Sequence, residues 1–391
     1  MGFIVAHNRD RDWYHVPLAL AEVGLLDRFV TDYYTGASRI HVPTLGHRRT
    51  RGIDPDAVVC SWPALIAQLP FEAARRWYPL DFPSYVVESA LGHTVAAVAR
   101  QCPKSDLLLY SGSARQAFRG PTTGRRVLFQ YHPSPSFIEG VVEGVDELAD
   151  AGDWIQEAEV DSPTRDRAHQ EEVARADLVL CASTFTKTGL IAEGVEPERI
   201  KVVPYGTPPI SSVDPVPAVD PVCRFIFVGQ GVARKGLHLL IEAWRRASLD
   251  RATLTLVTSR LDPAIAEFGR SVPGIEWVGR LSRADLDRRL SASDTLVLPS
   301  LVEGFGLVLG EGLASGTRLI ATRNTGLPDM EVPAGLATIV EPGRVEPLRQ
   351  ALVDHAATYL AERPYREDAL TAADRLSWVN FRGAVRRGLG L

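Results

Sequence analysis

Short apolar runs rich in β-branched residues alternate with amphipathic stretches along most of this chain. That alternation is the pattern of parallel βαβ units, in which helices cover each buried strand. In the first half we expect a helix through Pro17–Gly24 and strands at Phe3–Ala6, Asp106–Tyr110, Arg126–Tyr131, Asp177–Ala182 and Ile200–Val203. In the second half we expect a helix from Leu237 and strands at Arg224–Gly229, Thr253–Val257, Ile275–Val278, Thr295–Pro299, Arg318–Ala321 and Ala337–Val340.

A Pro-rich segment, residues 206–221, separates the two series of strands. Its prolines make it a semi-rigid linker, and the chain is long enough for two cores. We therefore predict an α/β fold of two doubly wound, Rossmann-like domains, residues 1–205 and 222–365. Ligands of such domains bind at the carboxyl ends of the strands, so the cleft between the domains is the expected site.

Composition excludes several other classes of protein. No apolar run approaches the roughly 20 residues that a bilayer-spanning helix needs, and no basic region precedes the apolar N-terminal run, which argues against a signal peptide. The four cysteines are scattered without C-x-x-C spacing, as in a cytoplasmic protein with reduced thiols. The net charge of −5 gives no overall field for nucleic acid, although local basic patches can still meet a phosphate or a membrane surface.

The first motif that carries chemistry is the run Phe227–Leu237, FVGQGVARKGL. Here a strand ends in a glycine-containing loop, and Gly231 allows close approach of a ligand to the backbone. Arg234 and Lys235 then lie next to a helix N-terminus, where free N–H groups favour anions such as a diphosphate. The alternative is an ordinary strand–helix turn with a solvated basic pair, since neither a P-loop nor a G-x-G-x-x-G pattern is present.

The second motif is Pro299–Glu311, PSLVEGFGLVLGE, in which two glutamates bracket seven residues. Glu303 lies in the loop after a strand, and Glu311 lies more than one turn into the next helix. Carboxylates accept hydrogen bonds from hydroxyl groups, so one can hold a hexose and the other a ribose. The simpler alternatives are a charge complementing the helix dipole and a solvated helical residue. A third motif, Thr325–Asp329 (TGLPD), borders the same edge of the sheet.

These three motifs, in this order and spacing, resemble the C-terminal domain of the retaining glycosyltransferases of sequence family 4. The resemblance covers about residues 224–347 and implies the GT-B architecture. It also implies that residues about 366–391 cross back onto the first domain as a helix. The first half matches only in its βαβ rhythm and at a few positions.

The resemblance implies a role for each residue of the motifs. Lys235, with Arg234, would bind the donor diphosphate; Glu303 would hold the donor sugar and Glu311 the ribose. Further expected donor contacts are Gly231, Arg280, Leu281, Gly304, Phe305, Gly306 and Leu307. Gln230 stands where relatives usually have an arginine, so either Arg234 supplies that charge or phosphate binding is weaker.

In the first half, His132 ends a strand where family members often carry a histidine near the anomeric carbon. We take His132 as a catalytic candidate with Glu303 and Lys235; the alternative is a structural strand-end histidine. Arg11, Trp13 and His15 are candidates for acceptor binding. The loop that contains them lacks the glycines usual in the family, which points to an unusual acceptor or loop geometry.

The resulting expectation is a cytoplasmic, metal-independent, retaining transferase with no cofactor beyond its nucleotide-sugar co-substrate. The D-x-D strings at Asp10–Asp12 and Asp54–Asp56 are interpreted as incidental and not as a metal site. The nucleobase (guanine or uracil), the sugar and the acceptor stay open. The acceptor can be a lipid, a glycan or a small soluble metabolite, and the lack of a long amphipathic basic stretch favours a soluble one. Two alternatives are a catalytically silent sugar-nucleotide-binding partner protein and a phosphorylase.

Overall fold

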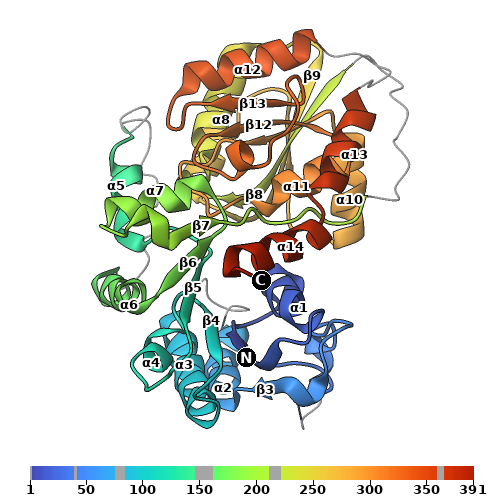
Figure 1. The fold of residues 1–391 in the computed structure, drawn as a ribbon. Coiled ribbons are helices and arrows are strands. Elements are labelled where there is room, and N and C mark those ends of the chain that lie inside the picture. Colours follow the sequence, from blue (N-terminus) through green and yellow to red (C-terminus); the bar gives the residue numbers. More distant parts are fainter. Residues whose placement is uncertain (1, 39–41, 75–83, 146–161, 211–221, 359–364) are drawn as a thin grey trace.

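The computed structural model describes residues 2–38, 42–74, 84–145, 162–210, 222–358 and 365–391. They form two domains, the first in the lower part and the second in the upper part of Figure 1. Most of the expected linker, residues 211–221, lies outside the described residues. Among the helices of the described ranges, none combines the length and the apolar character that a bilayer crossing requires.

The first domain is built on a parallel seven-stranded sheet of order β3-β2-β1-β4-β5-β6-β7. Its strands are β1 (Phe3–Ala6), β2 (Leu26–Thr31), β3 (Val58–Cys60), β4 (Asp106–Tyr110), β5 (Arg126–Gln130), β6 (Leu178–Cys181) and β7 (Ile200–Val202). Its helices are α1 (His15–Ala21), α2 (Trp62–Ala74), α3 (Ser84–Gln101), α4 (Arg115–Phe118), α5 (Pro135–Glu143), α6 (Ser162–Arg175) and α7 (Thr184–Ala192).

The second domain has a parallel six-stranded sheet of order β10-β9-β8-β11-β12-β13. Its strands are β8 (Cys223–Gly231), β9 (Ala252–Leu261), β10 (Ile275–Val278), β11 (Thr295–Leu298), β12 (Arg318–Thr322) and β13 (Ala337–Val340). Its helices are α8 (Leu237–Ala247), α9 (Pro263–Gly269), α10 (Arg283–Ala292), α11 (Leu307–Ala314) and α12 (Val345–Ala357), and α13 (Tyr365–Arg375) and α14 (Trp378–Leu389) follow.

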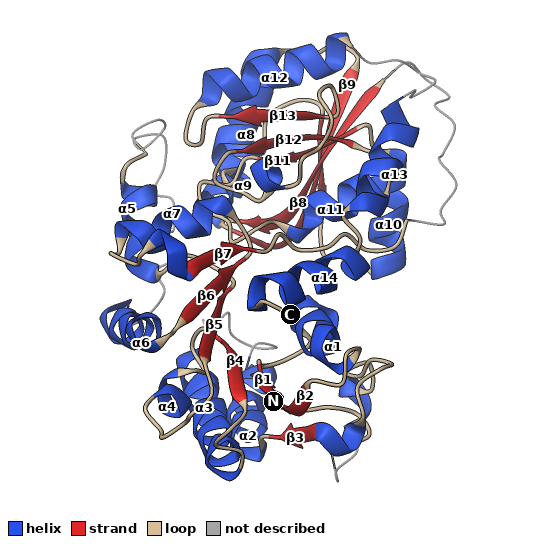
Figure 2. Cartoon of the chain, viewed as in Figure 1, coloured by secondary structure: helices blue, strands red, loops and turns tan. Residues whose placement is uncertain are grey.

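Both sheets are doubly wound, with helices on both faces (Figure 2). In each sheet the strand order reverses at one point, between β1 and β4 in the first domain and between β8 and β11 in the second. Such a reversal leaves a crevice at the carboxyl ends of the two strands. The prediction of two doubly wound α/β domains is confirmed.

The sequence-based expectation missed two strands at one edge of the first sheet. The first half of β2 carries Asp27 and Arg28 and is partly exposed, so only Phe29 and Val30 read as a buried run. β3 is three residues long, too short for a recognisable pattern. The first helix begins at His15, two residues earlier than expected, and ends at Ala21.

The last two helices connect the domains. α13 lies on the second domain, where Arg366 donates a hydrogen bond to the carbonyl of Ser315 (2.8 Å). α14 packs against α1 of the first domain, and its Arg382 and Arg386 pair with Glu22 at 2.7 Å and 2.9 Å (Figure 1).

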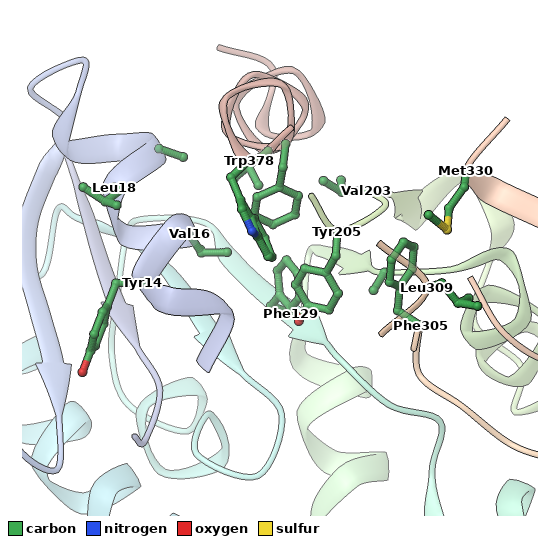
Figure 3. Close-up of a cluster of buried hydrophobic side chains, with 14 of the residues drawn as sticks. Tyr14, Val16, Leu18, Phe129, Val203, Tyr205, Phe305, Leu309, Met330 and Trp378 are labelled. Carbon is green, nitrogen blue, oxygen red and sulfur yellow. The ribbon is translucent and has the colours of Figure 1, made fainter. Parts of the chain in front are cut away.

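A buried aromatic cluster joins the two cores. Figure 3 shows Tyr205 lying between Phe129 of β5 and Phe305, which precedes α11, with Trp378 of α14 beside it. The ring centroids of Phe129, Phe305 and Trp378 lie 5.9, 5.6 and 5.9 Å from that of Tyr205. Aromatic groups at these spacings attract one another beyond their burial, so this cluster stabilises the interface beside the cleft.

Candidate active site

The loop after β8 lies against the carboxyl end of β11. Gly236 has φ +68°, and a Cβ atom there would lie 2.0 Å from the carbonyl oxygen of Pro299, so only glycine fits. The backbone of Leu301 donates to the carbonyl of Arg234 (2.9 Å), and the Arg234 guanidinium donates to the carbonyl of Val302 (3.1 Å). The first two motifs therefore form one structure at the reversal point of the second sheet.

Lys235 and Glu303 form an ion pair at this junction. Each side chain keeps only 14% of its surface exposed, so both charges are largely removed from water. Burial alone would raise the pKa of Glu303, but the positive charges of Lys235 and Arg234 outweigh it and hold that pKa below its ordinary value. Glu303 is thus an ionised carboxylate at neutral pH, held in place by a cation.

His132 lies beside this pair, across the domain boundary. Burial, reinforced by Arg234 and Lys235, lowers the pKa of His132 to about 4 although Glu303 acts the other way. A neutral imidazole at pH 7 can accept or donate one hydrogen bond without adding charge. The two domains pack closely at this point, as a Cβ atom at Gly304 would lie only 2.1 Å from the carbonyl oxygen of Tyr131.

A cavity of about 530 Å³ opens in front of these groups, between the domains. We call it the interdomain cavity. It is lined by Asp10, Arg11, Asp12, Trp13, Tyr131, His132, Tyr205, Glu303, Gly304, Phe305, Gly306 and Leu307. The residues of the second motif thus meet the first loop of the chain and the end of β5 around a single space.

A second cavity of about 460 Å³ lies within the second domain and is called the basic pocket below. Its lining is Val228, Gly229, Gln230, Arg234, Lys235, Val257, Ser259, Arg280, Leu281 and Leu286. Three cations and no carboxylate line this pocket, which suits an anion such as a diphosphate. Arg234 lines it together with Gln230, so a guanidinium is present beside the uncharged glutamine.

Two expected donor contacts lie outside the linings of these cavities. Gly231 ends β8, and a Cβ atom there would lie 2.6 Å from a methyl carbon of Leu261. Glu311 lies in α11, as expected, and pairs with Arg283 at 2.5 Å. Burial raises the pKa of Glu311 although Arg283 lowers it. Arg283 was missed in the sequence because nothing marked it among the charged residues of its helix.

The three candidates for acceptor binding have different surroundings. Arg11 and Trp13 line the interdomain cavity, and the Arg11 guanidinium carbon lies 3.8 Å from the centroid of the Tyr131 ring. His15 is not among the lining residues; its ring stacks on Trp378 with centroids 4.4 Å apart and an interplanar angle of 11°. The structure therefore brings two of the three to the cavity and gives His15 a contact with α14.

Asp12 was not predicted as a site residue, although its neighbours Arg11 and Trp13 were. The Tyr110 hydroxyl donates a hydrogen bond to Oδ2 of Asp12, and the buried Oδ1 has no hydrogen-bond partner within the described chain. Tyr110 and Asp12 are 98 positions apart, so no local pattern links them.

The other D-x-D string, Asp54–Asp56, lies in an exposed turn, where Asp54 accepts a hydrogen bond from the Asp56 backbone (3.0 Å). Within the described ranges no group of three or more His, Cys, Asp or Glu side chains could hold a metal ion.

Comparisons with known proteins agree with this arrangement. Residues 223–357 match the family described as "Glycosyl transferases group 1". The chain is 31% identical over 194 residues to MMP α-(1→4)-mannosyltransferase of Mycolicibacterium hassiacum, which is 47% of this chain and 46% of that protein. It is 30% identical over 155 residues to a GDP-mannose-dependent phosphatidylinositol monomannoside mannosyltransferase of Corynebacterium glutamicum, covering 37% and 39%. The matched stretch thus spans less than half the length of each of these relatives.

Among solved structures, sucrose-phosphate synthase of Thermosynechococcus elongatus superposes over 100% of this chain and 99% of its own, with a TM-score of 0.70 and 16% identity. At that identity the likeness establishes the fold alone. The family match lies over the first two motifs, and the fold match extends over both domains. The chain has the GT-B fold, and its second domain is similar to the group 1 glycosyltransferases, in agreement with the resemblance to sequence family 4.

Proposed function

We propose that this protein is a retaining, metal-independent glycosyltransferase of the cytoplasm. It would take a sugar from a GDP- or UDP-sugar and deliver it to an acceptor in the interdomain cavity. The observation that carries the proposal is the Lys235–Glu303 ion pair. Lys235 lines the basic pocket and Glu303 lines the interdomain cavity, so the pair marks the point where the two spaces meet.

The basic pocket fits the nucleotide part of the donor. Arg234 and Lys235 would supply positive charge for a diphosphate, and Arg280 and Leu281, in the same lining, would contact the nucleobase. Glu311 would accept hydrogen bonds from the ribose hydroxyls after exchange of its contact with Arg283. Relatives named as mannosyltransferases, one of them GDP-mannose-dependent, support a nucleotide sugar as the donor.

The reaction follows from this placement. On donor binding, Lys235 would exchange Glu303 for the diphosphate and stabilise the charge that develops on it. Glu303 and His132 would then bind hydroxyl groups of the donor sugar at the boundary of the cavity. The bond from the anomeric carbon to the phosphate oxygen breaks while a bond to the acceptor oxygen forms on the same face. The acceptor proton passes to the leaving phosphate, so no protein nucleophile is required.

One observation favours a second candidate, a sugar-nucleotide-binding protein without turnover. Gln230, where relatives usually carry an arginine, lines the basic pocket without charge. Arg234 in the same lining supports the transferase, because it supplies a guanidinium to the same space. Nucleotide binding with no release of nucleoside diphosphate in the presence of any acceptor would favour the second candidate.

The first test is thermal stabilisation of the purified chain by a panel of nucleoside diphosphates. A ligand at 100 times its Kd adds about 2.7 kcal/mol to the free energy of unfolding. We expect a clear shift with one base that is lost in Lys235→Ala and weakened in Glu311→Ala. No shift with any nucleotide at saturating concentration would overturn the donor assignment and with it the proposed function.

A further inference from the structure

The interdomain cavity differs in charge from the basic pocket next to it. Its lining contains the carboxyl groups of Asp10, Asp12 and Glu303 and one guanidinium, that of Arg11, while burial keeps His132 neutral at pH 7. Glu303 is balanced by Lys235, and Asp12, with its pKa raised to about 7, carries only part of a negative charge at that pH. The charged residues in the lining of the basic pocket are all cations. A charged phosphate would therefore be favoured in the basic pocket and would find no excess of positive charge in the interdomain cavity.

Internal carboxylates also occupy the anion-binding positions of the first domain. After β4, the backbone N–H groups of Gly112, Ala114 and Arg115 converge on the fully buried carboxylate of Glu172, at 2.8, 2.9 and 2.9 Å. A cluster of N–H groups at a strand end is the usual place for a ligand phosphate. Here a side chain of the protein itself fills that place.

The same holds after β2. Buried Asp32 accepts hydrogen bonds from the Arg9 backbone (2.6 Å), the Arg48 guanidinium (2.6 Å) and the Gln68 amide (2.7 Å). Arg11, the cation of the cavity lining, donates to the side chain of Asn8 (3.1 Å) and lies over the Tyr131 ring. The Arg9 backbone N–H group and Nε of Arg11 are thus engaged within the protein.

Asp12 lines the cavity with a carboxyl group that is engaged in part within the protein. Its Oδ2 accepts a hydrogen bond from Tyr110, the residue as a whole is 7% exposed, and Oδ1 has no hydrogen-bond partner of good geometry among the described residues. A buried acceptor without such a partner is costly, so a ligand hydroxyl that supplied the missing hydrogen bond would bind favourably. Burial raises the pKa of Asp12 to about 7, although Tyr110, Arg11 and the nearby backbone N–H groups of His15 and Tyr14 lower it, and both forms of the carboxyl group can bond a hydroxyl.

The rest of the lining is aromatic. Trp13, Tyr131, Tyr205 and Phe305 present flat apolar rings, and Trp13 is 39% exposed. Rings of this kind cover the apolar faces of a ligand while nearby carboxyl groups bind its hydroxyls. From these observations we infer that the interdomain cavity takes an uncharged, hydroxyl-rich acceptor, a sugar or cyclic polyol, and that Asp12 binds one of its hydroxyl groups. This inference rests on the proposed transfer function.

The test uses the full chain and matched pairs of probe acceptors. The donors are nucleotide sugars that carry the nucleobase found to stabilise the protein in the thermal shift experiment. The pairs are methyl α-mannoside with mannose 6-phosphate, methyl α-glucoside with glucose 6-phosphate, and myo-inositol with inositol 3-phosphate. Vesicles containing phosphatidylinositol serve as a lipid acceptor. Nucleoside diphosphate release above the acceptor-free rate, with mass spectrometry of the product, reports transfer. We expect at least one uncharged probe to have a kcat/KM ten or more times that of its phosphorylated counterpart.

Two variants test the role of Asp12 and the lining. Asp12→Asn should raise the acceptor KM about tenfold, because an amide oxygen accepts a weaker hydrogen bond from a hydroxyl group than a carboxylate does. Its nucleotide-induced thermal shift should equal that of the wild type. Asp56→Asn, which removes an exposed carboxylate outside the cavity, is the matched control. Trp13→Leu changes a partly exposed position and should also raise the acceptor KM. It keeps the test possible if Asp12→Asn does not fold.

The outcomes separate this inference from the donor assignment. A nucleotide shift together with preferred transfer to phosphorylated probes or to vesicle lipid would overturn the uncharged acceptor. The same holds if nucleotide binds and no uncharged probe is turned over. An unchanged acceptor KM in both folded variants would remove the role of Asp12 and the aromatic lining. Absence of any nucleotide shift would instead refute the proposed function itself.

Discussion

Replacing Lys235 by methionine removes the cation that faces Glu303 and leaves a buried carboxylate without its main partner. Breaking a buried ion pair in this way costs about 3–5 kcal/mol. Both side chains keep 14% of their surface exposed, and Arg234 also contributes positive charge near Glu303. We therefore expect the lower end, about 3 kcal/mol, as the loss in the free energy of unfolding of the second domain.

The double-mutant cycle isolates the pair from the rest of this effect. Glu303→Gln should also destabilise the domain, because it leaves Lys235 buried without a counter-charge. The variant with both changes buries no unpaired charge, so it should lose less than the sum of the single losses. We expect a coupling energy of about 2 kcal/mol, within the range for residues in direct contact. Urea titrations at pH 7.5, followed by circular dichroism and tryptophan fluorescence, measure all four proteins.

The coupling should also depend on pH with a definite sign. The pKa of Glu303 is below its ordinary value of 4.5, so the folded state binds this proton more weakly than the unfolded state. The stabilisation is complete above pH 4.5 and is lost as the pH falls through the lowered pKa. Additive losses within about 0.5 kcal/mol at pH 7.5 would refute the description of Lys235 and Glu303 as a coupled pair.

Three further predictions concern other parts of the molecule. Glu311→Gln should weaken nucleoside diphosphate binding about tenfold through loss of a ribose contact, which thermal shift titration measures; an unchanged Kd would remove Glu311 from the donor site. Burial, aided by Arg318, lowers the pKa of His355 to about 3, so the stabilisation that neutral His355 provides is complete above pH 6.5 and is lost as the pH falls toward 3. In acid titrations of His355→Gln, the free energy of unfolding should change less steeply with pH over that interval, and an unchanged slope would contradict the assignment. Gly304→Ala would place a Cβ atom 2.1 Å from the Tyr131 carbonyl oxygen, so transfer should fall far more than the circular dichroism signal of folding; full turnover would show that the domains need not meet there.

The second domain was the part most readily predicted from the sequence. All six of its strands overlap the expected runs, because each contains several consecutive or alternating apolar residues, and β11 and β12 are buried along their whole length. The first two motifs combine local residues, since Arg234, Lys235 and Glu303 each lie in a short loop that follows a strand. A local pattern thus carries most of the information about that side of the cleft.

The part of the interdomain cavity that the first domain lines was less predictable for a physical reason. The contacts that shape it join distant positions, such as Tyr110 with Asp12 and Trp378 with His15. The first loop also adopts a left-handed backbone at Asp12, Trp13 and Tyr14, with φ of 41°, 47° and 66°, which no residue there announces. Only the assembled fold brings Asp12 into the lining of the cavity.

The return of the chain through α14 has a mechanical consequence. The chain leaves the first domain near Thr207 and comes back near Leu376 and Ser377, and these two crossings touch: the Thr207 backbone donates to the carbonyl of Leu376 at 2.8 Å. Two domains tied at adjacent chain crossings resist sliding and twisting at that point more than rotation about it. We expect such a rotation to separate Gly304 from Tyr131 when the cleft opens and to return His132 and Glu303 to the same alignment when it closes.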